Sequence, residues 1–483
     1  MTRKEFLTLL AAGSASQALA QAPSATPPAT TPASAKKPPA PPLTLPPVQP
    51  GPHYLLAGPM LGHVGPNEAR VWIRATAPGP WTVRIGESAS MADAREISGP
   101  ALGGESGHTG TLVIDGLKPA TRYFYAVSLD GRPQTVAPLP SFVTAPEIGA
   151  KGRQRIAFGS CVGDTIAAAA PAWGELAARR EMGEKAGGFE LLLMLGDNHY
   201  ANTQEIAKLR TYYTAHRLSA GWRDLTARTP IYAIWDDHDF GPNDSDGTEP
   251  KKADSLRIFR EYWANPACGE PENAGCYFTV QRGDVQLFML DCRYWRSPDK
   301  AKDGPDKTMW GAKQLEWLKR ELLASKAAIK LLANGSEWQT FSSPDSFAVY
   351  RHERDAFFAW IDEQKIEGVM LLSGDRHFAA GYHVLGRFVE FSSGPFGSGN
   401  AALRPNKERF TGYDEGRMWF VLDLDTTGAE PAVTWELWQA GGGLLERRAL
   451  TWAQIHGREK IALSPYPLKA PRMEAKPAVI NPA

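Results

Sequence analysis

Two hydrophobic patterns divide the chain. Between residues 55 and 145, apolar and polar side chains alternate along short runs, and Gly and Pro residues separate these runs. Alternation with a period of two buries one face of a segment, so the pattern predicts antiparallel strands that pack as a β-sandwich. The clearest runs are residues 69–74, 81–85 and 121–127.

After Pro146 the pattern changes to continuous apolar runs that alternate with longer stretches of helical character. Such alternation is typical of a mixed α/β domain whose strands are buried on both faces. The two patterns place the β-sandwich at residues 53–146 and the α/β domain at residues 147–466. The predicted strands are residues 155–158, 191–195, 231–235, 285–290, 330–333, 369–372 and 388–391, and the predicted helices are residues 172–185, 204–216, 255–263, 312–323 and 353–364.

The first 20 residues have the pattern of an export signal. Arg3 and Lys4 precede an apolar stretch that ends in Ala-Leu-Ala, a small-residue cleavage site, so a mature chain should begin near Gln21. The opening residues also resemble a twin-arginine signal in which Lys4 replaces the second arginine. We therefore expect a periplasmic or secreted protein.

Two further segments lack the apolar content of a folded domain. Residues 21–52 are dense in Pro, Ala, Ser and Thr and should form a linker, and residues 467–483 should form a C-terminal tail. No stretch beyond the signal reaches the roughly 20 apolar residues that span a bilayer, so no membrane span is expected.

The composition excludes some classes of function but does not identify one. The 483 residues are 43% apolar and 10% aromatic, which is enough for a large core. Lys plus Arg equals Asp plus Glu, 53 against 53, so no excess positive charge predicts a surface specific for nucleic acid. Recognition should therefore occur at a local site that takes a small substrate, and the oligomeric state stays open.

Reactive side chains follow four of the predicted strands directly. Residues 236–239 place three carboxylates and one imidazole side by side, and a cation is the simplest counter-ion for such a group, although a solvated acidic turn is an alternative. The carboxyl ends of strands are where open α/β sheets bind ligands. The four clusters are Gly159-Ser160-Cys161, Gly196-Asp197-Asn198-His199-Tyr200, Asp236-Asp237-His238-Asp239 and Ser373-Gly374-Asp375-Arg376-His377.

Together these clusters resemble the metallophosphoesterase pattern, and their combination is similar to the alkaline phosphatase D family, which is related to purple acid phosphatases. The resemblance covers residues 55–460. It implies an α/β/β/α sandwich behind an N-terminal fibronectin-like β-sandwich. Two positions depart from the family pattern: Val162 stands where Gln is common, and Asn334 is the one residue available where many relatives have a mid-chain His.

The resemblance also implies two metal ions. The first is a ferric ion, and the second shares the carboxylate of Asp197. Because the donors of the second site are all oxygens, calcium is expected ahead of zinc. The implied ligands are Cys161, Asp197, Tyr200 and His377 for Fe³⁺, and Asp197, Asp237, Asp375 and either Asn243 or Asn334 for Ca²⁺, with Zn²⁺ as the alternative.

The implied reaction is hydrolysis of phosphate monoesters, diesters or both, by attack of metal-activated hydroxide on phosphorus. His238 would stabilise the transition state or protonate the leaving oxygen, Arg376 would bind a phosphoryl oxygen, and Asn334 is a second candidate for substrate binding. Ser160 lacks the Gly-x-Ser-x-Gly setting of a nucleophile. The alternatives are a phospholipase or nuclease with the same centre and a noncatalytic binding protein on this scaffold.

The remaining cysteines suggest structural roles. Cys268 and Cys276 are separated by Gly, Pro and Asn residues, so in an exported protein a local disulfide is expected between them. Cys292 ends an apolar strand and should be buried and free. Arg293 resembles a recurring family position, and a structural ion pair is an equally good reading of it.

Overall fold

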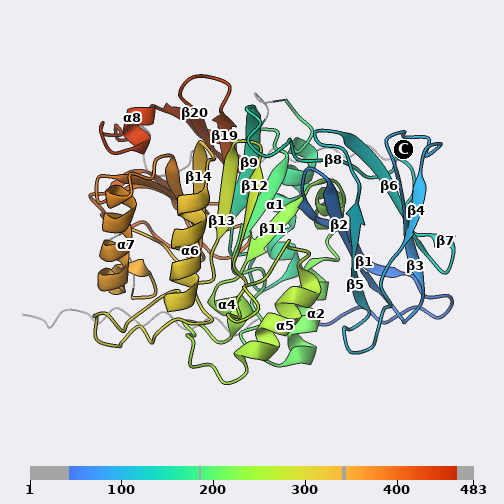
Figure 1. Ribbon diagram of the computed structural model, residues 1–483. Helices are drawn as coiled ribbons and strands as arrows, with labels where there is room; N and C mark the ends of the chain where they lie inside the picture. The colour runs from blue at the N-terminus through green and yellow to red at the C-terminus, as the bar shows by residue number, and fades with distance from the viewer. Residues whose placement is uncertain (1–42, 184–186, 340–343, 465–483) are drawn as a thin grey trace, which may run out of the picture. The chain divides into compact units, whose positions relative to one another are not determined.

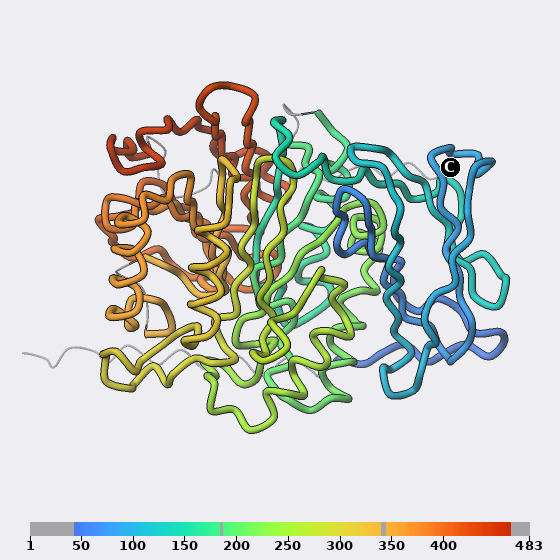
Figure 2. The backbone as a smooth tube through the Cα atoms, viewed as in Figure 1, coloured from blue at the N-terminus to red at the C-terminus, as the bar shows by residue number. Residues whose placement is uncertain are grey.

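The computed structural model describes residues 43–183, 187–339 and 344–464 of the chain (Figures 1 and 2). The predicted signal peptide, most of the predicted linker and the predicted tail at 467–483 lie outside these ranges. Within the described ranges, no helix combines the length and the apolar character that a membrane crossing requires.

The first described region is made of two antiparallel sheets. Alternate residues of β6 point into the core between them, as the period-two pattern predicts, and Tyr125 and Val127 of this strand are fully buried. One sheet has the order β1 (Leu55–Val64), β2 (Glu68–Ala75), β5 (Thr109–Asp115). The other has the order β4 (Arg95–Ser98), β3 (Trp81–Gly86), β6 (Arg122–Leu129), β7 (Arg132–Pro133), and β8 (Ser141–Val143) also pairs with β6.

Two larger mixed sheets form the α/β region, and one apolar cluster contains residues of both, including Leu192 and Leu331. The six-stranded sheet has the order β11 (Ile231–Ile234), β10 (Leu191–Leu195), β9 (Arg153–Gly159), β19 (Met418–Asp425), β20 (Ala432–Gln439), β21 (Gly443–Leu450). The seven-stranded sheet has the order β12 (Phe278–Arg282), β13 (Val285–Met289), β14 (Ile329–Ala333), β15 (Val369–Ser373), β17 (Phe388–Ser392), β16 (Ala379–Val384), β18 (Arg409–Tyr413).

Helices cover the outer faces of these sheets. Apolar residues of α6 and α7 form a second cluster with the seven-stranded sheet, while α1, α2, α3 and α5 add their apolar residues to the first cluster (Figure 1). The predicted α/β/β/α arrangement is therefore confirmed. The helices are α1 (Ile166–Arg179), α2 (Ile206–His216), α3 (Ala220–Arg228), α4 (Asp237–Phe240), α5 (Lys252–Tyr262), α6 (Ala312–Ala324), α7 (Arg351–Glu363) and α8 (Trp452–Ile455), with a 3₁₀ turn at Phe347–Val349.

The β-sandwich contacts the helix that follows the acidic loop. The indole Nε1 of Trp72 on β2 donates to the backbone oxygen of Glu261 on α5 at 2.7 Å, and Arg74 donates to the Tyr262 hydroxyl at 2.9 Å. Trp72 also belongs to the apolar cluster of the α/β region. These contacts hold α5 against the β-sandwich.

One predicted helix is displaced. The prediction of 172–185 began after Pro171, but α1 starts at Ile166 and carries Pro171 inside it. Ala167, Ala168, Ala169 and Ala170 precede the proline, and alanine is the strongest helix former, so the helix continues across it.

Candidate metal centre

The strands bring the four reactive clusters to one edge. β9, β10 and β11 run parallel to one another, so Cys161, Asp197 and Asp237, which follow them, lie at the same end of the six-stranded sheet. Asp375 and His377 follow β15 of the seven-stranded sheet. The site is therefore built between the ends of two sheets.

Four predicted ligands meet around one point. The Tyr200 hydroxyl donates to Oδ2 of Asp197 at 3.0 Å and lies 2.9 Å from Nε2 of His377. The Cys161 sulfur lies 3.5 Å from the same carboxylate oxygen. The ligand atoms of Cys161, Asp197 and His377 all lie within 4.8 Å of one another. Sulfur, phenol, carboxylate and imidazole donors together fit a transition metal of high charge.

Burial dominates the protonation behaviour of this group, and neighbouring acidic groups add to it. Burial, and then repulsion from Asp237, raises the pKa of Asp197 well above its ordinary value. Burial also raises the pKa of the Cys161 thiol and of Tyr200, with Asp197 adding to both effects. Burial lowers the pKa of His377 to about 4, which leaves its imidazole neutral and able to bind a metal. A bound cation would reverse the first three shifts.

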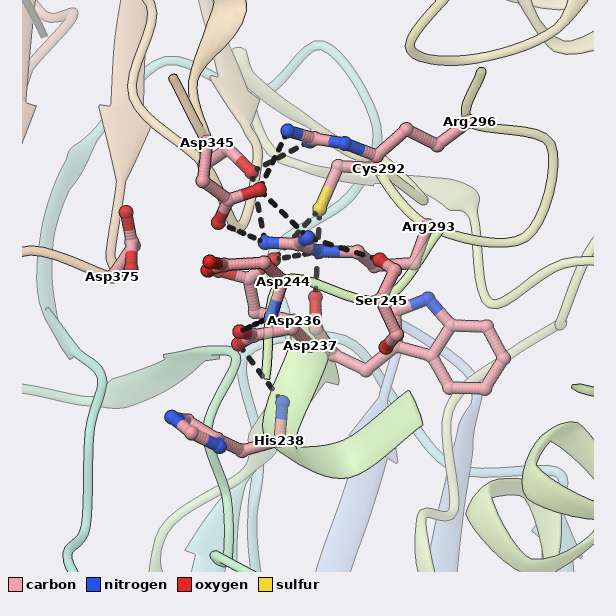
Figure 3. A network of polar contacts seen from close by, with 12 residues as sticks. Asp236, Asp237, His238, Asp244, Ser245, Cys292, Arg293, Arg296, Asp345 and Asp375 are labelled. Atoms are coloured by element: carbon pink, nitrogen blue, oxygen red, sulfur yellow. Dashed lines mark hydrogen bonds and ion pairs between the residues drawn. The ribbon is translucent and has the colours of Figure 1, made fainter. Parts of the chain in front are cut away.

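A second group consists of carboxylates (Figure 3). Asp236, Asp345 and Asp375 place one oxygen each within 4.8 Å of one another, and so do Asp237, Asp244 and Asp345. A further group joins this set to the first through Asp197, Asp237 and His238. Oxygen donors dominate the second group, as a hard cation requires.

Two buried arginines neutralise part of this charge. The Nε of Arg293 donates to Asp236 at 2.5 Å, and its two Nη atoms donate to Asp345 at 2.9 and 2.7 Å. Arg296 donates to Asp345 at 2.6 Å (Figure 3). The side chains of both arginines are 0% exposed, so the ion-pair reading of Arg293 is correct.

This pairing divides the carboxylates by role. Asp236 and Asp345 form ion pairs with the buried arginines. Among the described residues, Asp375 has no such close pair, because the guanidinium of Arg376 lies 3.6 Å from it. Burial and the carboxylates of Asp345 and Asp236 raise the pKa of Asp375 well above its ordinary value. Burial would also raise the pKa of Asp237, but Arg293 and His238 outweigh it and lower this pKa. Asp237 is therefore ionised and available as a ligand.

The two predicted asparagines lie in different surroundings. Asn334 accepts from the Trp310 indole at 3.1 Å through its side-chain oxygen and donates to the backbone oxygen of Ser336 at 2.7 Å. Both ends of its amide thus have partners in the core. Asn243 is exposed, and its neighbour Asp244 belongs to the acidic group. The roles of Asn334 and Asn243 as ligands stay predictions.

Sequence reasoning missed Asp345 and Asp244. Asp244 could have been found from the sequence, because it lies one residue from Asn243. In the structure, its backbone N–H donates to Asp237 at 2.7 Å. Asp345 follows none of the predicted strands, so no local pattern marks it. Its place depends on the fold of the chain around Arg293.

The two predicted catalytic side chains lie beside the predicted metal ligands and reach solvent. The His238 ring lies over Tyr200 with centroids 4.0 Å apart, and its Nδ1 contacts Oδ1 of Asn202. Arg376 lies 3.6 Å from Glu337, and its side chain is 26% exposed. Both residues can therefore contact a substrate.

The backbone of the site is strained. Cys161, Asp197, Asp375 and His377 all have left-handed φ values, of 60°, 53°, 69° and 52°. Residues other than glycine rarely adopt this conformation, and it persists where the surrounding structure enforces it, often at functional sites. Gly374 allows the backbone to pass close to Ser160, because a Cβ at this position would lie 2.7 Å from Cβ of Ser160.

The predicted disulfide is absent. All four cysteines are free thiols, including Cys268 and Cys276. A backbone hydrogen bond closes this loop, in which the N–H of Gly269 donates to the oxygen of Tyr277 at 2.8 Å, and the backbone N–H of Cys276 donates to the Asp291 side chain at 2.8 Å. Cys292 is buried and free, as predicted.

A sequence model described as PhoD-like phosphatase matches residues 150–420, which contain all four reactive clusters. The chain belongs to the PhoD-like phosphatase family. A second model, described as a domain of unknown function, matches residues 52–147 of this PhoD-like protein. The resemblance inferred from the four clusters is therefore confirmed.

The PhoD-like chain is 27% identical to alkaline phosphatase D of Bacillus subtilis (strain 168) over 358 residues, which are 63% of this chain and 58% of that protein. It thus spans less than two thirds of this curated relative. The solved structure of PhoD matches with a TM-score of 0.68 and 17% identity, covering 84% of this chain and 93% of the other. A purple acid phosphatase from yellow lupin matches with a TM-score of 0.58 and 14% identity, covering 81% and 74%. These likenesses show the fold.

Proposed function

We propose that this chain is a metal-dependent phosphoesterase that hydrolyses phosphate monoesters, diesters or both. The geometry of Asp197 is the observation that carries this proposal. Its Oδ2 faces the Tyr200 hydroxyl and the Cys161 sulfur, while its Oδ1 is buried with no hydrogen-bond partner among the described residues. A buried carboxylate with one oxygen among the first donors and the other oxygen without a partner suits a bridge between two cations.

The donor sets support one transition metal and one hard ion. Cys161, Asp197, Tyr200 and His377 would hold Fe³⁺. Asp197, Asp237 and Asp375 would hold Ca²⁺ with oxygen ligands alone, and Asp244 is the nearest further carboxylate in place of Asn243. Zn²⁺ in the second position is the alternative. When bound, two such ions polarise phosphoryl oxygens and lower the pKa of a water molecule.

The other residues of the site position the substrate and move protons. Arg376 would bind a phosphoryl oxygen, because its planar guanidinium matches that geometry. His238 would hold Nδ1–H against Oδ1 of Asn202, so it could donate a proton from Nε2 to the leaving oxygen when the ring is doubly protonated. Ser160 is buried, and its hydroxyl donates to the Ser393 carbonyl at 2.8 Å, so it is a poor nucleophile.

The experiment combines metal analysis with a substrate panel. Protein as isolated should contain iron and calcium and should hydrolyse nitrophenyl phosphate, bis-nitrophenyl phosphate or both. Phospholipid and nucleic acid in the same panel test the phospholipase and nuclease alternatives. Metal-loaded protein that hydrolyses none of these esters would favour a noncatalytic binding protein instead.

The proposal also takes residues 1–20 as an export signal and places the enzyme in the periplasm or outside the cell, with domains at 53–146 and 147–466. Sequencing the N-terminus of exported protein tests the signal, and the chain should begin near Gln21. An N-terminus at Met1 in exported protein would remove this part of the proposal.

A further inference from the structure

A cavity with several basic residues lies away from the metal centre. It has a volume of about 860 Å³ and is lined by residues of α7, β16 and β18 and by residues that follow α8. Its wall combines apolar and basic side chains, and among the described residues that line it Glu408 is the one acid. The basic residues are Arg351, Arg354, Lys407, Arg409 and Lys460.

Strand β16 separates this cavity from the metal centre. The strand begins at Ala379, two residues after His377, and His383 near its other end lines the cavity. At about 3.3 Å per residue, the six residues from His377 to His383 span roughly 20 Å. A small phosphoester held at the metal centre would not reach this far.

Arg354 gives the cavity a buried cation. Its side chain is 5% exposed, and Asp355 accepts from its Nε at 2.9 Å and lies 2.8 Å from its Nη2. Its Nη1 is buried and has no hydrogen-bond partner among the described residues, and the same holds for Nε2 of His383. A buried N–H of a guanidinium without an acceptor is costly even when the group is otherwise paired, so an anion in the cavity would stabilise Arg354 through Nη1.

The charges around Arg354 also favour an anion in the cavity. Arg351 and Arg354 lie in the first turn of α7, where the helix dipole disfavours cations. Arg351 pairs with a partly buried carboxylate, Asp303, at 3.3 Å, and Arg409 donates to the backbone oxygen of Arg404 at 2.7 Å. This backbone contact leaves the positive charge of Arg409 in place.

We propose that this cavity binds a polyanion that carries several phosphate groups. One phosphate is too small to use cations distributed around about 860 Å³, whereas a chain of phosphates can contact several of them at once. Arginine forks match phosphate oxygens in pairs. The ligand is either a free polyphosphate or the phosphate-rich end of a long substrate. Because the cavity shares no residue with the metal centre, this proposal does not depend on the proposed hydrolysis.

Tripolyphosphate binding to the full-length metal-loaded protein tests the site by calorimetry. Arg409→Gln with Lys460→Gln should weaken binding about tenfold or more, and Lys208→Gln with Lys313→Gln, the same charge change at other positions, should not. These four residues are partly or fully exposed, so the variants should fold. Binding should persist in Asp197→Asn. Binding that is lost in Asp197→Asn and unchanged in the cavity variant would overturn the proposal, as would no binding by wild type.

Kinetics distinguishes the two sources of the ligand. If the cavity holds the far end of a long substrate, the cavity variant should lower kcat/KM for a phosphate-rich ester at least fivefold and leave nitrophenyl phosphate unchanged. If the ligand is a free polyphosphate, both substrates should keep their wild-type kcat/KM while tripolyphosphate binding is weakened. Equal losses with both substrates would indicate damage to the metal centre and would contradict a separate site.

Discussion

Asp197 combines three unfavourable features in one residue. It is buried, has a left-handed backbone, and is repelled by the carboxylates of Asp236, Asp237, Asp239 and Asp375. Each of these features by itself destabilises the folded protein. Two bound cations would offset this repulsion. The role of Asp197 can therefore be tested by measuring metal content as well as activity.

Replacing Asp197 by Asn should remove more than nine tenths of the phosphoesterase activity. The amide keeps the shape of the carboxylate but loses the charge that both ions share, so the iron and calcium contents should fall together. Metal analysis and a chromogenic ester measure the two effects. Asp306→Asn, at an exposed position, is the matched control. Activity above a tenth of wild type, or loss of one metal alone, would contradict a bridging role.

Replacing His238 by Ala should lower kcat by roughly 100-fold or more while the metal content stays constant. The loss should be smallest for a nitrophenyl ester, whose leaving group needs little protonation, and largest for an alkyl ester. His352→Ala, at an exposed position on α7, serves as the control. Equal losses with both esters would exclude the proton donor, and loss of metal would make His238 a ligand.

At the scale of elements, the strands carry the site and a buried ion-pair network fixes the loop between them. Arg293 links Asp236, which follows β11, to Asp345 in the segment between β14 and α7. Removing one partner from such a buried network leaves uncompensated charge. The network therefore positions Asp237 through the residue beside it.

Arg293→Met should lower the free energy of unfolding by about 3–5 kcal/mol, because Asp236 and Asp345 would both keep a buried charge without its main partner. Urea unfolding of protein prepared without added metal measures this loss. Arg320→Met is the control: Arg320 is 57% exposed and pairs with Glu270 at the surface, so its loss should cost at most about 1 kcal/mol. Similar losses for the two variants would show that the buried network contributes little.

The strands of the site were predictable because each is a short apolar run that ends in a reactive cluster. The prediction for β10 has the observed bounds, and those for β11, β13, β14, β15 and β17 differ by one residue at one end. What the sequence could not show depended on tertiary contacts. The Asn334 amide has Trp310 and Ser336 as partners, and Asp345, which the sequence analysis missed, is paired with Arg293 and Arg296. No local pattern records such contacts.

At the scale of the whole molecule, the two donor sets should be separable by their chemistry. A calcium chelator should inactivate the enzyme reversibly while iron stays bound, because an oxygen-only site exchanges its ion with water more readily than a site with thiolate and phenolate ligands. Added calcium should restore activity. Protein with iron should also absorb visible light, and Tyr200→Phe should shift or bleach this band.

The outcome that contradicts this assignment is a colourless active protein with zinc in both positions and no response to calcium. Hydrolysis of phosphoesters would then stand, but the division into iron and calcium sites would not. Metal analysis before and after dialysis against the chelator distinguishes the two cases.

The predicted ligands of the centre are spread along the sequence from Cys161 to His377 and follow strands of both sheets of the α/β region. During synthesis, the first set of donors is incomplete until His377 has left the ribosome and both sheets have formed. Metal capture by these residues would therefore be a late event, and the compartment in which the chain folds would decide which ions it receives.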